Sequence, residues 1–149
     1  MSLLGKKAPD FSLPDTTGKI VSLRDYANGK VLLVFYPGDE TSVCTAQLCS
    51  YSDGYEEFRK IGVSIIGINP QSMESHKKFE KKYNFKFPLL SDASGETCKA
   101  YGAMGIFGLK RAMTLIDENQ NVIFENAVMK LFYKNKDQVL ESIQKLLKH

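Results

Sequence analysis

The sequence lacks two features that mark membrane proteins and nucleic-acid-binding proteins. Its longest uninterrupted apolar run, residues 31–36, has the length of a β-strand, whereas a helix that spans a membrane needs about 20 apolar residues. Its 20 basic and 17 acidic residues leave a net charge of only +3. A nucleic-acid-binding protein would need a larger and more one-sided basic excess. We therefore expect neither a membrane nor a nucleic acid among its partners.

Cysteine is also scarce, with Cys44, Cys49 and Cys98 the only three. An odd count does not suit a disulfide framework, and the two histidines, His76 and His149, do not complete a zinc-binding pattern. The N-terminus shows no signal-peptide pattern, so we expect the chain in the cytoplasm. In that reducing compartment the cysteines would serve catalysis, redox exchange or plain packing.

The composition otherwise fits one globular domain. The chain is 43% hydrophobic and 25% charged, and a chain of this length buries a sizeable core without disulfides. We therefore assign residues 1–149 to a single domain. Periodicity and turn residues predict a hairpin from residues 11–13 and 19–23, strands at 31–36, 63–68, 112–116 and 121–125, and helices at 42–60, 73–83, 96–101 and after Asn135.

The order of these elements predicts the architecture. The strand–helix–strand part, with its continuous apolar strands, indicates a parallel pair buried on both faces. The strand–strand–helix part adds an antiparallel pair and a covering helix. The apolar stripe of that last helix comprises Val139, Leu140, Ile143, Leu146 and Leu147. We therefore expect an α/β fold, namely a thioredoxin-like three-layer α/β/α sandwich with an N-terminal β-hairpin extension.

Cys44 lies in the first turn of the helix expected after the strand at residues 31–36. Unpaired backbone N–H groups and the helix dipole favour an anion there, and the thiolate is the reactive form of cysteine. Position alone leaves a buried, inert cysteine as an equal alternative. Two neighbours favour reactivity. Thr41 lies where its hydroxyl can reach the sulfur, and Pro37 ends the strand, where it can shield the site from water.

Residues 35–45, FYPGDETSVCT, resemble the peroxiredoxin signature Pro-x-x-x-Thr/Ser-x-x-Cys. A second cysteine five positions on, Cys49, resembles the bacterioferritin comigratory protein or peroxiredoxin Q subfamily. Three further stretches are similar to the family's opening, its middle and the strand with its active-site arginine: GKKAPDF at 5–11, FPLLSD at 87–92 and KRAMTLID at 110–117. The resemblance covers nearly the whole chain.

The resemblance implies a thiol peroxidase that reduces hydrogen peroxide and organic hydroperoxides and needs no metal, haem or other cofactor. It implies that Cys44 is the peroxidatic cysteine and that Cys49 resolves its sulfenic acid as an intrachain disulfide. It also implies that Thr41 orients the peroxide, that Arg111 supports the thiolate, and that Pro37 shields the sulfur. A thioredoxin-type protein would re-reduce the disulfide, and we expect a monomer or weak dimer.

Two other functions stay open at this point. A general thiol–disulfide oxidoreductase would use the same cysteines, although the sequence has no Cys-x-x-Cys pair. A non-catalytic binding or chaperone-like module with a thioredoxin fold would leave the cysteines inert. For Cys98, which has no motif around it, packing is the default interpretation.

Helix geometry adds a prediction that does not depend on the family. On one intact helix, the Cα atoms of Cys44 and Cys49 would lie roughly 8–9 Å apart and about 140° apart around the axis. A disulfide needs Cα atoms about 4.4–6.8 Å apart. The helix must therefore unwind locally before the two sulfurs can bond. Between them, Gln47 replaces the Glu of many family members, and its amide should still form hydrogen bonds.

Overall fold

The computed structural model describes residues 2–39, 41–105, 108–128 and 135–147. The strands are β1 (Ser12–Pro14), β2 (Ile20–Ser22), β3 (Lys30–Phe35), β4 (Val63–Asn69), β5 (Leu89–Ser91), β6 (Met104–Gly105), β7 (Gly108–Leu109), β8 (Arg111–Ile116) and β9 (Val122–Val128). The helices are the 3-10 helix η1 (Leu23–Tyr26) and the α-helices α1 (Ser42–Asp53), α2 (Tyr55–Lys60), α3 (Met73–Tyr83), α4 (Glu96–Ala100) and α5 (Lys136–Leu147).

Five strands form the central sheet in the order β5–β4–β3–β8–β9. β3 and β5 lie parallel to β4, whereas β8 runs antiparallel to both β3 and β9. β3 and β4 are almost entirely buried apolar runs, as expected for strands covered on both faces. The register pairs Phe35, at the end of β3, with Ala112. The end of β3 therefore lies beside the start of β8, where Arg111 is located.

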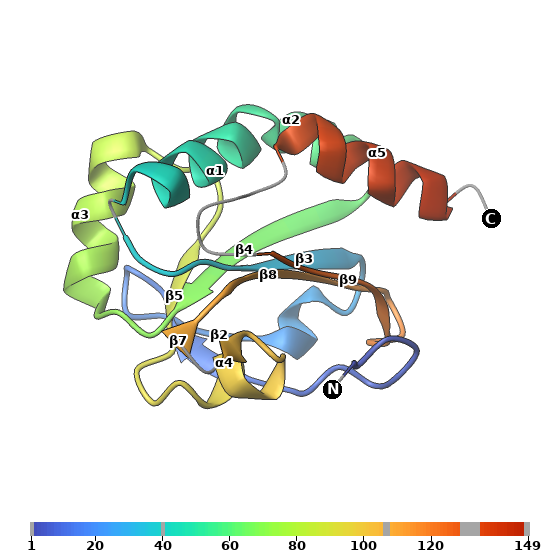
Figure 1. Ribbon diagram of the computed structural model, residues 1–149, viewed down its shortest axis with the longest axis horizontal. Helices are drawn as coiled ribbons and strands as arrows, with labels where there is room; N and C mark the ends of the chain where they lie inside the picture. The colour runs from blue at the N-terminus through green and yellow to red at the C-terminus, as the bar shows by residue number, and fades with distance from the viewer. Residues whose placement is uncertain (1, 40, 106–107, 129–134, 148–149) are drawn as a thin grey trace.

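Helices cover one face of the sheet and a mixed layer covers the other (Figure 1). On the first face, side chains from α1, α2, α3 and α5 share one core cluster with Leu32 and Leu115 of the sheet. On the second face, a cluster that includes Leu23 and Tyr101 packs beneath η1, α4 and the N-terminal segment. The three-layer sandwich expected from the sequence is confirmed.

The N-terminal hairpin is confirmed as well. β1 and β2 pair antiparallel, and the turn between them is closed by Asp15, whose Oδ1 accepts hydrogen bonds from the backbone N–H groups of Thr17 and Lys19. Gly18 lies at φ +86°, a conformation that favours glycine. Before the hairpin, the chain runs beside β9, where the Val122 N–H donates to Lys6 O over 2.9 Å.

The single helix predicted over residues 42–60 is wrong in one respect, because Gly54 interrupts it between α1 and α2. A Cβ atom at Gly54 would lie 2.4 Å from Cδ of Lys136, so this position has no room for a side chain unless Lys136 shifts. The first residue of α5 thus packs directly against the junction. Its backbone N–H donates to Ser50 Oγ over 3.0 Å, which ties α5 to the last turn of α1.

The apolar stripe of the last helix is shorter than predicted. Val139, Leu140 and Ile143 are buried, as expected, but Leu146 and Leu147 are 37% and 38% exposed. In Figure 1 the C-terminal end of α5 extends past the sheet, which leaves its last turn without a surface to pack against. The predicted cap of this helix is confirmed, because Asn135 Oδ1 accepts the Gln138 N–H over 3.0 Å.

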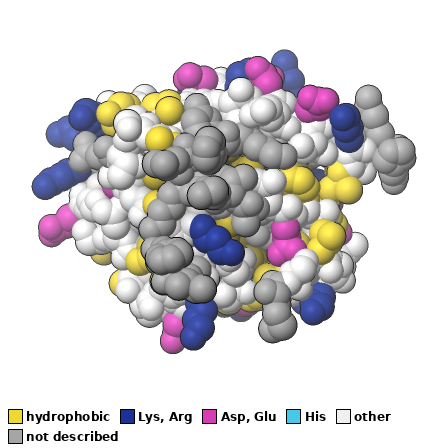
Figure 2. All heavy atoms as spheres, viewed as in Figure 1, with side chains coloured by type: hydrophobic (Ala, Val, Ile, Leu, Met, Phe, Trp, Pro, Cys, Tyr) yellow, Lys and Arg dark blue, Asp and Glu magenta, His cyan; other side chains and the backbone are white. Residues whose placement is uncertain are grey.

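The surface carries charges of both signs, as the balanced composition predicted. Figure 2 shows Lys and Arg side chains interspersed with Asp and Glu side chains around the visible face. On α3 the exposed lysines follow one another along the helix and are accompanied by acidic residues: Lys77, Lys78, Lys81, Lys82, Glu74 and Glu80. This face of α3 is therefore a solvated helix surface.

Candidate active site

Cys44 lies where the sequence placed it, in the first turn of the helix that follows β3. Thr41 caps that helix, and its Oγ1 accepts the Cys44 N–H over 3.4 Å while donating to Gly38 O over 3.3 Å. The cap leaves the cysteine sulfur near the positive end of α1, where an anion is favoured. Cys44 is 1% exposed, so a small substrate would meet its sulfur in a nearly water-free setting.

Arg111 reaches the same sulfur from the sheet. Its Nη1 donates a hydrogen bond to Cys44 Sγ over 3.3 Å. The pairing of β8 with β3 brings the two together, although they are 67 residues apart in sequence. Arg111 is 2% exposed, so its permanent positive charge is held in the interior, where it acts on an anion with little screening. The structure thus brings together Cys44, Thr41 and Arg111.

Gln47 holds the guanidinium of Arg111 in place. Gln47 Oε1 accepts from Arg111 Nη1 over 2.5 Å, and Gln47 Nε2 donates to Tyr51 Oη over 3.1 Å. Tyr51 Oη in turn donates to Met113 Sδ over 3.4 Å. Both Gln47 and Tyr51 are fully buried. The expectation that Gln47 still forms hydrogen bonds is confirmed. The participation of Tyr51 in this hydrogen-bond network was not predicted from the sequence.

The sequence model of the AhpC/TSA family matches residues 4–125. The chain is 40% identical over 145 residues to chloroplastic peroxiredoxin Q of Sedum lineare, covering 97% of this chain and 75% of that protein. It is also 40% identical over 123 residues to the putative peroxiredoxin bcp of Coxiella burnetii, covering 77% of this chain and 82% of that protein.

The chain belongs to the AhpC/TSA family. Its relatives place it among the peroxiredoxins of the peroxiredoxin Q and bcp kind, as the sequence indicated. It spans 64% of the rice peroxiredoxin Q and 65% of the Arabidopsis thaliana one, which are longer.

Solved structures agree with this assignment. The peroxidoxin BcpB of Mycobacterium tuberculosis is 29% identical and superimposes with a TM-score of 0.84, covering 99% of this chain and 97% of that chain. A mutant of Xanthomonas campestris peroxiredoxin Q is 27% identical with a TM-score of 0.82, covering 91% and 90%.

The second cysteine of this peroxiredoxin, Cys49, lies on the same intact helix as Cys44. It is half-buried at the edge of the core cluster beneath α1. Burial, together with the carboxylate of Asp53, raises the pKa of the Cys49 thiol. Both cysteines are free thiols in this structure. The arrangement is therefore that of the reduced helix, before any unwinding.

Pro37 and Cys98 were also considered in the sequence, the first as a shield for the sulfur and the second as a packing residue. Pro37 follows β3 and is half-buried; its shielding role stays a prediction. Cys98 is fully buried on α4, in the core cluster on the far side of the sheet from Cys44. Burial and the neighbouring Asp92 carboxylate raise the pKa of the Cys98 thiol far above its usual range. Its interpretation as a packing residue is supported by this environment.

In the sequence, His76 was considered only as a zinc ligand, and its contacts were not predicted. Its side chain is fully buried and contacts Asp39 in the loop that leads to Cys44, with Nδ1 2.6 Å from Asp39 Oδ2. A signal was present in the sequence. Positions 76 and 79 of α3 share one helix face, and Phe79 on that face is in the core.

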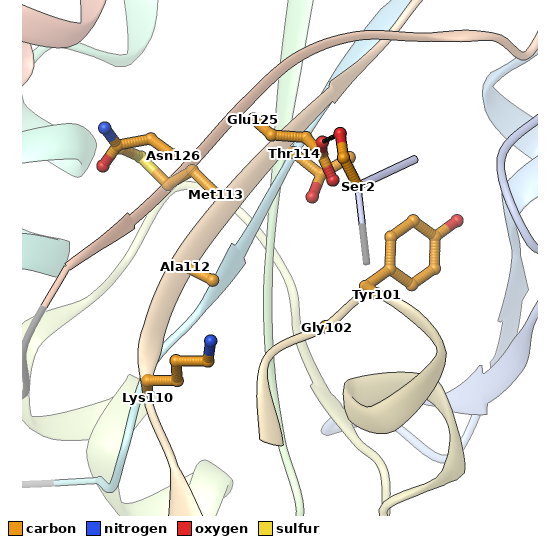
Figure 3. Close-up of a pocket in the computed structure, with 9 residues that line it drawn as sticks. All are labelled: Ser2, Tyr101, Gly102, Lys110, Ala112, Met113, Thr114, Glu125 and Asn126. Atoms are coloured by element: carbon orange, nitrogen blue, oxygen red, sulfur yellow. Dashed lines mark hydrogen bonds between the residues drawn. The ribbon is translucent and has the colours of Figure 1, made fainter. Parts of the chain in front are cut away.

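A cavity of about 220 Å³ lies against β8 and β9. Figure 3 shows Tyr101, Lys110 and Glu125 among its lining residues, with Ser2 hydrogen-bonded to Glu125. Of its other lining residues, Ala112 belongs to the second core cluster and Met113 to the cluster that contains Cys44. Its lining residues do not include Cys44, Thr41 or Arg111.

Among the described residues, no group of three or more His, Cys, Asp or Glu side chains is placed to hold a metal ion. Every helix within the described ranges is too short or too polar to span a bilayer.

Proposed function

We propose that Cys44 is the peroxidatic cysteine of this thiol-dependent peroxidase. The observation that carries the proposal is the 3.3 Å hydrogen bond from the buried Arg111 guanidinium to Cys44 Sγ at the start of α1. A fixed positive charge and the N-terminus of a helix both favour a thiolate over a thiol. A thiolate is the form of sulfur that attacks a peroxide.

Atoms and electrons balance in the proposed reaction. The Cys44 thiolate attacks one oxygen of the hydroperoxide, so an S–O bond forms as the O–O bond breaks. The sulfur loses two electrons and becomes a sulfenic acid, and the second oxygen leaves as an alkoxide or hydroxide that takes up a proton. Negative charge thus moves from sulfur to the departing oxygen, and donors fixed along that line stabilise the transition state.

Three residues would supply the setting for this step. Arg111 would bind the thiolate and the developing charge through its guanidinium N–H groups. Thr41, whose Oγ1 lies 3.4 Å from the Cys44 backbone nitrogen, would orient the peroxide through its hydroxyl. Pro37 would exclude water from the sulfur. These roles derive from the peroxiredoxin signature, and the positions of Thr41 and Arg111 beside Cys44 support them.

Cys49 would complete the cycle. Its thiol attacks the Cys44 sulfenic sulfur, a disulfide forms, and water leaves. A thioredoxin-type dithiol protein would then reduce the disulfide. Because α1 carries both cysteines on one continuous helix, this bond requires local unwinding. The protein would alternate between a helical state that reacts with peroxide and a locally unwound state that holds the disulfide.

The substrates would be hydrogen peroxide and organic hydroperoxides. A structure of the Xanthomonas campestris bacterioferritin comigratory protein, which is 27% identical, is described in terms of alkyl peroxide reduction. We predict that the protein is located in the cytoplasm and that it is a monomer or weak dimer.

Peroxide consumption tests the activity directly. Purified protein with an excess of a small dithiol should consume hydrogen peroxide and cumene hydroperoxide with one dithiol oxidised per peroxide. A thiol–disulfide oxidoreductase would instead reduce insulin disulfides without consuming peroxide. A binding or chaperone-like module would do neither, so the two assays separate the three functions.

Hydrogen exchange should report the unwinding. The side chains of Leu48 and Tyr51, on the packed face of α1, are fully buried. Moving each of them into water would cost roughly 1.5–3 kcal/mol. The oxidised protein should lose exchange protection across residues 42–54 relative to the reduced protein, while α3 and α5 change little. Equal protection of residues 42–54 in both states would mean that this helix does not open.

Replacing Cys49 with serine should make Cys44 easier to over-oxidise. Without a resolving thiol in the chain, the sulfenic acid persists and meets a second peroxide, which gives sulfinic acid. Mass spectrometry after exposure to excess peroxide should show the sulfinic form accumulating faster in Cys49→Ser than in wild type. Cys98→Ser is the matched control and should resemble wild type. If Cys49→Ser also behaves like wild type, another thiol resolves Cys44.

A further inference from the structure

Asp39, in the loop between β3 and α1, is bound by three other parts of the fold. Its carboxylate accepts hydrogen bonds from Tyr36 Oη over 2.7 Å and from Ser75 Oγ over 2.6 Å, and lies 2.6 Å from His76 Nδ1. Its backbone N–H donates to Gln71 Oε1. The side chains of Asp39 and His76 are 2% and 0% exposed. This buried cluster therefore fastens the loop to α3 and to the connection that precedes α3.

The hydrogen bonds determine where the protons are. His76 Nε2 lies 3.0 Å from the carbonyl oxygen of Leu90, which can only accept, so Nε2 carries a proton. On the other side of the ring, the carboxylate of Asp39 already accepts from two hydroxyl groups. On the other nitrogen, Nδ1 and Asp39 Oδ2 are 2.6 Å apart, so one proton must lie between them and join the two side chains in a hydrogen bond.

The electrostatics of the cluster agree with this arrangement. Burial opposes the ionisation of Asp39, but the hydrogen bonds from His76 and Ser75, with the bond from Tyr36, outweigh it and lower the pKa of Asp39. Burial and the Asp39 carboxylate raise the pKa of Tyr36 well above its usual range, so its hydroxyl remains a donor. Among the residues that the structure describes, Asp39 from the loop and Tyr36, which directly follows β3, face His76, and the ring centroids of Tyr36 and His76 are 6.4 Å apart.

The cluster continues into the thiol site through the loop itself. Gly38, next to Asp39, accepts the hydrogen bond of the Thr41 hydroxyl, and the same Thr41 oxygen accepts the Cys44 N–H. Gly38 also lies beside Gln71, since a Cβ atom at Gly38 would be in ordinary van der Waals contact with Gln71 Oε1. A movement of Asp39 would therefore be passed on to the cap of α1.

We propose that His76 is a positioning residue for the peroxide reaction, in which its ring holds the Asp39 carboxyl group through a hydrogen bond and so fixes the loop that presents Thr41 to Cys44. The inference rests on the proposed role of Cys44. Removing the imidazole would leave a buried carboxyl group without this hydrogen-bond partner, which is strongly unfavourable. The loop would rearrange to hydrate Asp39, and the cap of α1 would lose its fixed position.

Two replacements of His76 distinguish the effect of its hydrogen bond to Asp39 on the reaction rate from the effect of its side-chain volume. His76→Leu removes both N–H groups, whereas in His76→Asn the amide nitrogen branches from the same carbon as Nδ1 and can still donate to Asp39. The rate constant for Cys44 oxidation by hydrogen peroxide, measured by stopped flow, should fall roughly tenfold or more in His76→Leu, the range of a lost hydrogen bond to a charged group. His76→Asn should recover most of that loss.

Phe79→Leu is the matched control, because it removes buried volume from the same face of α3 without touching Asp39. At an equal loss of thermal stability, Phe79→Leu should keep the wild-type rate constant. A rate loss in Phe79→Leu equal to that in His76→Leu, or no recovery in His76→Asn, would reduce His76 to a structural residue and overturn the proposal.

The Cys44 assignment is tested separately: if Cys44→Ser keeps its activity, the proposed function fails whatever His76 does, whereas an inactive Cys44→Ser beside an unaffected His76→Leu refutes only the positioning role.

Discussion

Cys44→Ser should abolish peroxide reduction. The hydroxyl of serine does not ionise near neutral pH, so neither Arg111 nor the N-terminus of α1 can turn it into a nucleophile comparable to a thiolate. Nothing else in the chain would replace it. Cys49 has a raised pKa and lies further along the same helix, and Cys98 is buried on the other side of the sheet.

The measurement is peroxide consumption with excess dithiol, compared among Cys44→Ser, Cys98→Ser and wild type. Cys98→Ser should keep the wild-type rate. If Cys44→Ser retained activity within about tenfold of wild type, a difference of only about 1.4 kcal/mol in barrier, the reaction would have to occur elsewhere and the assignment of Cys44 would be wrong.

Arg111→Ala should slow the reaction of Cys44 with peroxide on the order of 10²-fold or more. The guanidinium donates to Cys44 Sγ over 3.3 Å from a buried position, and loss of one preorganised donor to a developing charge typically has an effect of this size. The loss should appear in the second-order rate constant for sulfenic acid formation. Disulfide reduction by the dithiol should be much less affected, because that step does not involve a peroxide.

A matched control distinguishes this effect from a general loss of positive charge. Arg59 is an exposed arginine on α2 that pairs with Glu56 over 3.5 Å, and Arg59→Ala should react like wild type. Arg111→Lys should recover part of the rate, because it keeps a cation without the planar fork that also binds Gln47. A change below about threefold in Arg111→Ala would reduce Arg111 to a structural charge, since a lost catalytic donor costs far more.

The sequence predicted those features that depend on local pattern. The continuous apolar runs of β3 and β4 predicted the sheet. The turn residues between the two short strands near the N-terminus predicted the hairpin. The position of Cys44 after a strand, with Thr41 three residues before it, predicted a capped helix with the cysteine in its first turn. The meeting of Arg111 with Cys44 came from the family resemblance, because local pattern contains no information on a contact across 67 residues.

The features that were missed depend on packing between distant segments. The break at Gly54 coincides with the close approach of Lys136, and the exposure of Leu146 and Leu147 follows from where α5 ends relative to the sheet. The contacts of His76 were not predicted either. Its partner Asp39 lies 37 residues earlier, in a loop whose path the sequence does not reveal.

The attachment of α5 to the end of α1 has a consequence for the oxidised protein. Lys136 binds Ser50 through its backbone and Glu57 through Nζ over 2.6 Å, while Asp39 is held at the other end of the segment. A helix advances 1.5 Å per residue, but an unwound chain can extend to about 3.3 Å per residue. If both ends of the segment stay fixed, the unwound chain is longer than the distance between those ends. The released residues must then protrude into solvent as a loop, so a reductant would reach the disulfide on this exposed loop rather than in a cleft.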